Sequence, residues 1–394
     1  MRQQTERRFR SSRRQGGRGR RAVSAAAAVV AVGFAAMGAV APPAASAAAG
    51  ADGVQQGLNA LVHADGLPAA LASVRGGDGR TRNYTAGVGD LATGSKVPAD
   101  GQVRIGSNTK TFTAVVVLQL VGEGRLSLDT KVDSVLPGVV RGEGIDGSRI
   151  SVRELLQHTS GLPDYEDLVT EDMLRQRYFE PRDLLDIAFR RKAAFDPGEK
   201  WAYSNTNYVV AGLIVQKVTG RPLGEEVDRR VIKRIGLRHT YFPSPGDMTV
   251  RERHPRGYHR DAADAPLRDA TEIDPSAAWA AGQMISTNSD LNRFFTALLA
   301  GGLLSPAQLA EMRTTVPIGN TGAGYGLGLM SRPLSCGGVY WGHGGDITGY
   351  ETRGGVTDDG HAVNIAVTSI PIGGAATKRL DGVVDTALCR SRSE

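Results

Sequence analysis

Gly106-Ser107-Asn108-Thr109-Lys110 directly precedes an apolar run from Phe112 to Val121, and the segment predicts a helix with reactive side chains at its start. Residues three apart share a helix face, so the Lys110 amine is expected over the Ser107 hydroxyl. A serine needs a neighbouring base to become a nucleophile, and a lysine partly removed from water can be that base. Alone the signal is weak, since roughly one Ser-x-x-Lys occurs by chance in a chain of this length.

The composition is that of a globular protein of one or two domains, with 394 residues, 41% hydrophobic and 22% charged. The formal net charge of +6 is unevenly distributed. Residues 1–21 hold nine arginines and one glutamate, so their +8 leaves −2 for the rest of the chain. The folded part therefore offers no electrostatic case for nucleic-acid binding, and the sequence has no zinc-finger spacing or basic helix.

The N-terminal segment has the pattern of an export signal. A basic stretch is followed by an apolar run from Ala22 to Ala41 and by the small residues Ala45-Ser46-Ala47. Cleavage is predicted after about Ala47, and Arg20-Arg21 permits a twin-arginine signal. An uncleaved anchor is the alternative, because the run is about long enough to span a bilayer. We expect a secreted protein with no stable membrane anchor after cleavage.

The two cysteines, Cys336 and Cys389, are compatible with one disulfide, because export allows the bond to form. The bridge would close a loop of about fifty residues and stabilise the fold by roughly 4 kcal/mol in the chain-entropy model. Two unrelated buried thiols are the alternative.

Strand patterns occur at both ends of the chain and helix patterns in the middle. Strands are expected at 67–74, 82–88, 339–341, 350–356 and 361–368. Helices are expected from Ser107 to about 122–124, from the capping box 151–154 to 157, over 205–218, after Thr287, after Ser305 and over 374–388. We predict an α+β fold with one antiparallel sheet built from both chain ends. The expected parts are a signal peptide (1–47), an α/β domain (48–125 and 285–394) and a mainly helical subdomain (126–284).

Two further segments carry side chains that suit a serine hydrolase. Tyr203-Ser204-Asn205 precedes a helix, where Ser or Asn is also a good cap. A tyrosine near a lysine could have a lowered pKa and shuttle protons, and the amide could hold the lysine and a substrate carbonyl. His343-Gly344-Gly345 follows a strand, and a strand edge can supply a backbone N–H for an oxyanion hole. A hairpin turn with a chance histidine is the alternative there.

The remaining histidines offer little chemistry. His254 and His259 lie in a loop-like stretch, and we interpret His158 as structural. The sequence has neither His-Glu-x-x-His nor a Cys/His cluster, so no metal site and no cofactor is predicted. It also lacks the Gly-x-Ser-x-Gly motif of α/β-hydrolases and a phosphate-binding glycine loop.

Ser-x-x-Lys, Tyr-x-Asn and His-x-Gly, in this order, resemble the serine β-lactamase and penicillin-binding-protein superfamily in its class C branch. Within it the chain is most similar to secreted actinomycete D-alanyl-D-alanine carboxypeptidases. The similarity extends from about Leu58 to Cys389 and includes the segments 155–162, 203–212 and 324–329 and the placement of both cysteines. The resemblance implies an antiparallel sheet flanked by helices, an inserted all-helical subdomain, and a site between them.

The resemblance also implies a role for each site residue. Ser107 would be the acylated nucleophile, Lys110 would help to take its proton, and Tyr203 would relay that proton to the leaving amine. The substrate would be bound by Asn205, by the oxyanion-hole N–H groups of Ser107 and Asp346, and by His343, Gly344, Gly345 and Trp279 around them. β-Lactams would acylate the same serine.

Three positions depart from the pattern of these carboxypeptidases, which grip the substrate's terminal carboxylate with two threonines and an arginine. Here the corresponding residues are Gly344, Asp346 and Met330. A carboxylate at Asp346 would repel that terminus. Arg332 or Arg353 are the candidates to compensate.

The sequence is therefore compatible with three candidate functions. The main prediction is a secreted D-alanyl-D-alanine carboxypeptidase acting on peptidoglycan stem peptides. The second uses the same machinery as an esterase, a D-aminopeptidase or amidase, or a β-lactamase, and the departures favour it. The third is a non-catalytic protein that binds penicillin or cell-wall peptide, although such a protein need not retain Ser107, Lys110 and Tyr203.

Overall fold

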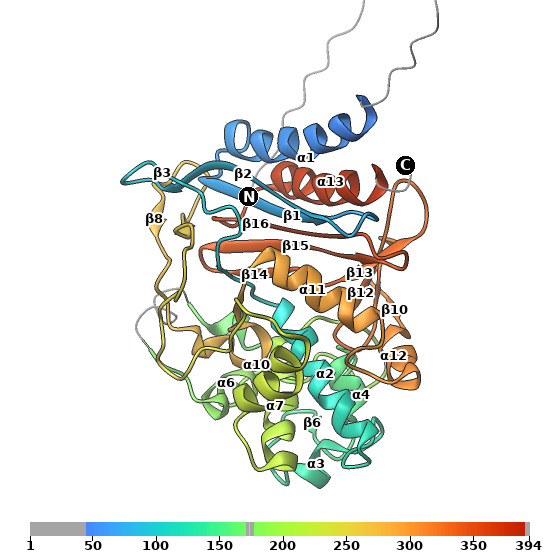
Figure 1. Ribbon diagram of the computed structural model, residues 1–394. Helices are drawn as coiled ribbons and strands as arrows, with labels where there is room; N and C mark the ends of the chain where they lie inside the picture. The colour runs from blue at the N-terminus through green and yellow to red at the C-terminus, as the bar shows by residue number, and fades with distance from the viewer. Residues whose placement is uncertain (1–44, 171–172, 174–176, 391–394) are drawn as a thin grey trace, which may run out of the picture. The chain divides into compact units, whose positions relative to one another are not determined.

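The computed structural model of the chain describes residues 45–170, 173 and 177–390. Its centre is an antiparallel sheet in the order β10-β11-β12-β13-β15-β16-β1-β2-β3, with β14 paired to β15 (Figure 1). The early strands are β1 (Ala69–Arg75), β2 (Thr81–Asp90) and β3 (Ser95–Lys96). The late strands are β10 (Val316–Pro317), β11 (Gly324–Tyr325), β12 (Met330–Pro333), β13 (Val339–Gly342), β14 (Gly345–Ile347), β15 (Tyr350–Thr357) and β16 (Ala362–Val367).

Both chain ends build this sheet, because the first strand lies between the second and the last. In β1, Ala70 is opposite Val367 of β16 on one edge and opposite Ala86 of β2 on the other. The predicted α+β fold with an antiparallel sheet from both ends is confirmed. Short two-stranded pairs lie outside it: β4 (Val103–Arg104) with β9 (Ile285–Ser286), β5 (Arg141–Gly142) with β6 (Ile145–Asp146), and β7 (Tyr258–His259) with β8 (Arg268–Asp269).

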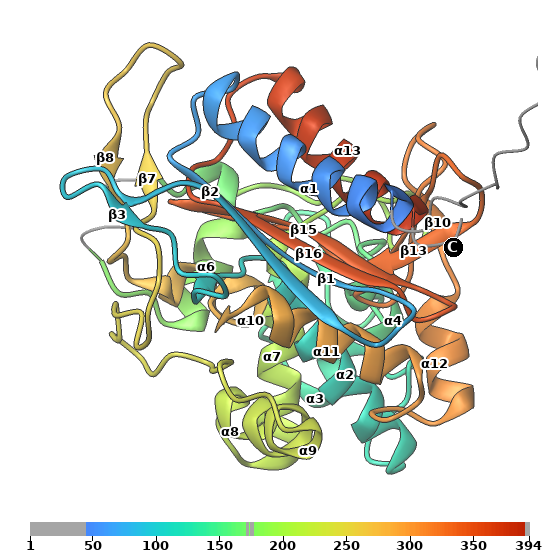
Figure 2. The same cartoon turned by 45° about the horizontal axis from the view of Figure 1, so that its top comes forward.

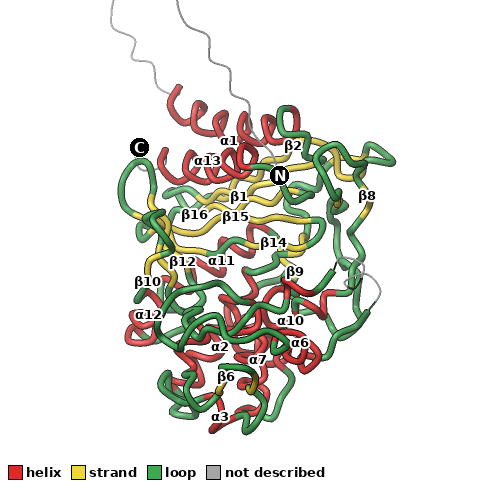
Figure 3. Tube along the Cα trace, turned by 180° about the vertical axis from the view of Figure 1, so that it is seen from behind, coloured by secondary structure: helices red, strands yellow, loops and turns green. Residues whose placement is uncertain are grey.

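Helices cover both faces of the sheet. One face carries α1 (Ala45–His63) and α13 (Gly374–Arg390), and the other carries α11 (Asn288–Leu299), as Figures 2 and 3 show from two further sides. Strand side chains alternate between faces. In β1, Ala70 and Ala72 therefore belong to the core under α1 and α13, while Leu71 belongs to the larger core on the α11 side.

The middle of the chain forms a helical region around α2 (Asn108–Gly122), which is buried from Asn108 to Leu120. Phe112 of α2 stacks on Phe294 of α11, with ring centroids 3.7 Å apart, and so joins this region to the sheet layer. The other helices are α3 (Val132–Val135), α4 (Val152–Leu156), α6 (Pro181–Ala188), α7 (Asn205–Thr219), α8 (Leu223–Val227), α9 (Lys233–Ile235), α10 (Trp279–Gly282) and α12 (Pro306–Arg313). The capping box predicted at 151–154 is present.

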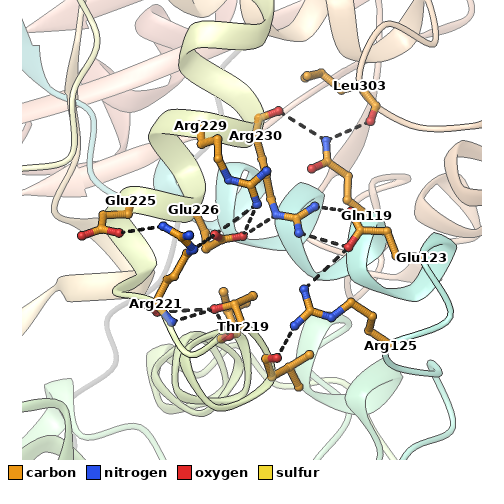
Figure 4. A network of polar contacts seen from close by, with 12 residues as sticks. Gln119, Glu123, Arg125, Thr219, Arg221, Glu225, Glu226, Arg229, Arg230 and Leu303 are labelled. Carbon is orange, nitrogen blue, oxygen red and sulfur yellow. Dashed lines mark hydrogen bonds and ion pairs between the residues drawn. The ribbon is translucent and has the colours of Figure 1, made fainter.

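A buried ion-pair network fastens the segment after α8 to the end of α2 (Figure 4). The Glu226 carboxylate, 1% exposed, pairs with Arg229 and Arg230, and Arg230 also pairs with Glu123. A buried carboxylate is costly unless it is paired. Glu226 has a third guanidinium partner in Arg221, whose Nε lies 3.9 Å from Glu226 Oε1. The network thus holds the far end of the helix that carries Ser107 at its beginning.

The predicted disulfide is present between Cys336 and Cys389, whose Cα atoms are 5.6 Å apart. It joins the turn between β12 and β13 to the last turn of α13. The predicted export signal, residues 1–47, lies outside the described residues except for its last three. Across the described ranges, no helix has both the length and the apolar character needed to cross a membrane.

Candidate active site

Ser107 lies where the β4–β9 pair meets α2. Strand β4 ends at Arg104, and Ser107 is the N-cap residue of α2. Gly106 connects them with a positive φ of 47°, which favours glycine. A Cβ atom on Gly106 would also be only 2.8 Å from the backbone nitrogen of Asp346. The glycine therefore brings the nucleophile's backbone against β14.

The Ser107 hydroxyl has the two side-chain partners that the sequence predicted. Lys110 Nζ lies 2.9 Å from Ser107 Oγ, because the two residues are three positions apart at the start of α2. The Tyr203 hydroxyl donates to the same oxygen at 2.8 Å, from the loop that begins α7. The structure thus brings three residues from two distant segments to one oxygen atom.

Lys110 is oriented by two further acceptors. Its Nζ contacts Asn205 Oδ1 at 2.6 Å and the Ala281 carbonyl at 2.8 Å. Burial lowers the Lys110 pKa to about 7, although the nearby Glu166 and Asp164 carboxylates act in the opposite direction. A neutral amine has two hydrogens and one lone pair. With the hydrogens on Asn205 and Ala281, the lone pair faces Ser107 Oγ, as a general base requires.

Tyr203 differs from the prediction in one respect. Its pKa was predicted to be lowered by the nearby lysine, and this is wrong, because burial raises the Tyr203 pKa well above 10. The phenol therefore stays neutral and meets Ser107 as an O–H donor rather than as a phenolate.

Two neutral histidines, His158 and His343, pack near the Tyr203 ring. His343 Nε2 lies 3.0 Å from the Tyr325 hydroxyl, which lies 3.1 Å from His158 Nε2. Burial and the Lys110 charge lower the pKa of His343 to about 3 and hold that of His158 well below 6.5. The His158 ring centroid is 4.4 Å from that of Tyr203. His158, interpreted from the sequence as structural, is thus buried directly against a candidate catalytic residue.

The glycines of the His-x-Gly segment allow β14 to approach closely. A Cβ on Gly345 would be 1.9 Å from the Ile105 carbonyl oxygen, so no side chain fits there. The backbone nitrogen of Asp346 follows directly and lies beside Gly106. The N–H groups of Ser107 and Asp346 remain the predicted oxyanion donors, and they lie on adjoining backbone segments.

A pocket opens beside Ser107, and its lining is acidic. Three carboxylates, Glu166, Asp274 and Asp346, line it together with Asn205, and no basic side chain does so within the described part of the chain. The rest of the lining is mostly apolar: Tyr165, Val169, Ile273, Pro275, Ala277, Ala278, Ala281, Gly282 and Ile347, with Thr348.

Trp279, predicted to line the site, is not among the residues that line this pocket. Its ring packs against α7, where a Cβ on Gly212 would be 2.8 Å from Trp279 Cζ3. The indole instead lines a separate cavity with Phe179 and Phe242. The prediction fails because the small residues of α10, not its first side chain, face the pocket.

Two acidic residues near Lys110 were not predicted. Asp164 accepts from the Asn205 backbone N–H at 3.0 Å and from its side-chain Nδ2 at 3.1 Å, and Glu166 accepts from the same Nδ2. Removal from water raises the pKa of both carboxyls. In the sequence they resemble ordinary surface acids of a loop, and only their position after the 155–162 segment hints at the site. Among the described residues, including this site, no group of His, Cys, Asp and Glu is arranged to hold a metal ion.

The profile of the β-lactamase family matches residues 54–383, which is most of the chain. The protein belongs to the β-lactamase family. Among solved structures, this family member is similar to a D-stereospecific amidohydrolase from Streptomyces sp., with 41% identity and a TM-score of 0.78 over 84% of this chain and 98% of the other. The D-amino acid amidase of Ochrobactrum anthropi SV3, complexed with L-phenylalanine amide, has 28% identity and a TM-score of 0.78 over 88% and 99% of the two chains.

The curated relatives of this β-lactamase-family chain include an esterase. Esterase EstB of Burkholderia gladioli is 31% identical over 287 residues, which are 63% of this chain and 71% of the esterase. Other curated relatives match over 156 residues, so that the chain spans about a third of their length. Members similar to this chain thus include amidases and an esterase.

Proposed function

We propose that this serine hydrolase cleaves amides of D-amino acids that carry a free α-amino group, through an acyl-enzyme on Ser107. The observation that carries the proposal is the lining of the Ser107 pocket, which has three carboxylates and no basic side chain among the described residues. Such a lining attracts an α-ammonium group and repels a free carboxylate. The similarity to two D-specific amidases supports the D configuration.

In acylation, Ser107 Oγ attacks the amide carbon while Lys110 Nζ accepts the hydroxyl proton. The Lys110 pKa of about 7 leaves much of the amine neutral at physiological pH, so it can act as the base. The N–H groups of Ser107 and Asp346 donate to the oxyanion that forms.

Breakdown of the tetrahedral intermediate needs a proton on the leaving nitrogen. The Tyr203 hydroxyl, 2.8 Å from Ser107 Oγ, is placed to give it as the C–N bond breaks, and the proton held by Lys110 restores the phenol. Water then attacks the acyl-enzyme ester, its proton passes to the same base, and Ser107 leaves with a proton. The products are the D-amino acid and the amine or ammonia.

Glu166 is the side chain assigned to the substrate α-ammonium. It lines the pocket and accepts a hydrogen bond from Asn205 Nδ2. The apolar residues Val169, Ile273 and Ile347 line the same pocket and suit an apolar side chain on the substrate.

The D-alanyl-D-alanine carboxypeptidase prediction is less well supported, because neither candidate arginine is unpaired. Arg353 pairs with Asp346 at 2.7 Å and with Glu351 at 2.5 Å, and Arg332 lies 3.7 Å from Asp381. A free substrate carboxylate therefore has no unpaired cation assigned to it. The intact proton relay around Ser107 argues against a purely binding role.

Ester hydrolysis is the second candidate function, favoured by the 31% identity to an esterase. Attack by Ser107 and formation of the acyl-enzyme are the same for an ester and an amide. An alkoxide also leaves more readily than an amine. Export also remains a proposal, supported by the disulfide, since such bonds are typical of oxidising compartments.

The test is a substrate panel of D-phenylalanine amide, L-phenylalanine amide, N-acetyl-D-phenylalanine amide and the methyl ester of N-acetyl-D-phenylalanine. We expect kcat/KM for D-phenylalanine amide to exceed that for the other two amides by at least roughly tenfold. A tenfold preference over the acetylated amide corresponds to about 1.4 kcal/mol of ammonium binding. Glu166→Gln should raise KM for that substrate and leave the acetylated ester nearly unchanged. Faster turnover of the acetylated amide than of the free amine would contradict the proposal.

The pH dependence of kcat/KM should differ between charged and uncharged substrates. For the acetylated ester, the rate should rise with pH through about 7 and then level off, because Lys110 must lose its proton to act as base. For D-phenylalanine amide, a second limb should fall above about pH 8, where the substrate ammonium, with a pKa of about 7.7–8.0, loses its charge.

Glu351 provides the control for this profile, because burial raises its pKa to about 7, within the same range. Glu351→Gln removes that titration and leaves Lys110 in place. The rising limb for the ester should persist in this variant, and its disappearance would assign the limb to Glu351 instead.

A further inference from the structure

An arginine lies directly behind one of the pocket carboxylates. Arg353 Nη1 donates to Asp346 Oδ1 at 2.7 Å, and Nη2 lies 3.4 Å from Asp346 Oδ2. The Asp346 side chain is 54% exposed and lines the pocket, whereas that of Arg353 is only 14% exposed. The carboxylate therefore stands between the guanidinium and any bound substrate.

The local backbone makes room for this arrangement. Strands β14 and β15 pair with Asp346 opposite Glu351, which places Arg353 two residues along β15. Its guanidinium lies over Gly344, where a Cβ would be 2.9 Å from Nη1. A larger residue at 344 would push Arg353 away, so the glycine keeps the guanidinium at the edge of the pocket.

Arg353 has a second, buried partner. Its Nη2 lies 2.5 Å from Glu351 Oε1, and the Glu351 side chain is 3% exposed. A buried guanidinium left without a charged partner is strongly destabilising, and Glu351 supplies such a partner. Loss of the Asp346 carboxylate would therefore leave Arg353 paired with Glu351 and in place, with its Asp346-facing N–H groups available to another anion.

We infer that Asp346 occupies the position in which a carboxylate on the substrate's leaving group would bind Arg353, and that it thereby excludes leaving groups that end in a free carboxylate. The inference rests on the proposed function, in which Glu166 takes the ammonium of the acyl part, and it adds that the leaving group extends toward Asp346 of β14, which lines the same pocket. Arg353 is then a masked carboxylate-binding residue, and Asp346 is the specificity residue that masks it.

The test compares a matched substrate pair, D-phenylalanyl-D-alanine and its C-terminal amide, by the ratio of kcat/KM for acid to amide. The parent enzyme should prefer the amide by at least roughly tenfold, since one charge pair at a partly exposed site has about this effect. Asp346→Ser, which opens the space, should shift the ratio toward the acid by roughly tenfold. Asp346→Asn, which removes the charge and keeps the shape, should shift it less in the same direction. The ratio cancels any common change in acylation, and every variant retains the backbone N–H of residue 346.

Two controls separate the masking from a general effect on the pocket. Asp346→Ser combined with Arg353→Met should lose the gain for the acid, because the cation is gone. Glu351→Gln should leave the ratio unchanged, because the Asp346–Arg353 pair persists. A ratio within twofold of the parent in Asp346→Ser, or a gain that survives Arg353→Met, would overturn the inference.

The inference and the proposed function can fail separately. If the parent enzyme cleaves no D-amino acid amide, the proposed function fails, and the same ratio is measured on N-acetyl-D-phenylalanyl esters of D-lactate and of D-lactamide. A shift toward the lactate ester in Asp346→Ser would then support the masking by itself. No shift on either pair would refute it.

Discussion

Ser107→Ala should abolish turnover of every amide and ester, with kcat reduced by roughly 10³–10⁶, as for removal of the nucleophile in other serine hydrolases. The reason is geometric, because both Lys110 Nζ and the Tyr203 hydroxyl contact Ser107 Oγ. Without it the base and the acid have no shared reacting group.

A labelled penicillin gives a second measurement of the same residue. The parent protein should form a covalent adduct, detectable by mass, because the strained lactam presents a carbonyl to the same hydroxyl. Ser107→Ala should form none, whereas the exposed Ser95→Ala should label like the parent. An adduct in Ser107→Ala, or activity within tenfold of the parent, would place the nucleophile elsewhere.

Lys110→Met should reduce kcat/KM by roughly 10³–10⁴ while the protein still folds. Methionine fills the buried space without a charge, but Asn205 Oδ1 and the Ala281 carbonyl lose their donor, at a cost of about 1–3 kcal/mol each in stability. The measurement is kcat/KM on the acetylated ester together with a thermal melt.

Lys110→Arg is the matched control, because a guanidinium stays protonated and cannot accept the Ser107 proton at any working pH. It should be as inactive as Lys110→Met, and any residual activity should lack the rising limb near pH 7. Activity within tenfold of the parent in either variant would mean that another group is the base. The neutral His343 or the Tyr203 phenol would then be next to examine.

The long elements were predictable because their signals are local and regular. Turn residues bound β1, β15 and β16, with Gly76–Gly79 after β1 and 357–360 between β15 and β16. Ser151 and Thr287 mark helix starts with hydrogen bonds that the structure contains. The short strands β10, β11 and β14 escaped prediction, since two or three residues are too few to show a period, and β11 and β14 also begin with glycine. Helix α1 was missed because its first turns are rich in alanine and continue from the predicted export signal.

The site was predictable where spacing or motif fixes it, and not where packing does. Lys110 reaches Ser107 because the two are three positions apart at the start of a helix, whereas Asp164 and Glu166 reach Asn205 only through the path of a loop. The sequence indicated that Asp346 would repel an anion. Only the structure places Arg353 behind it, because that contact depends on the pairing of β14 with β15.

The position of β1 in the sheet has a consequence for how this protein comes to be folded. Ala70 pairs with Val367, so the two residues that complete the middle of the sheet are nearly three hundred positions apart in the chain. Contacts of such long range make folding slow, because a large loop must close before the contact is gained. The sheet that supports Ser107 cannot close until almost all of the polypeptide has been synthesised, and a chain cut short before β16 lacks the strand that β1 needs.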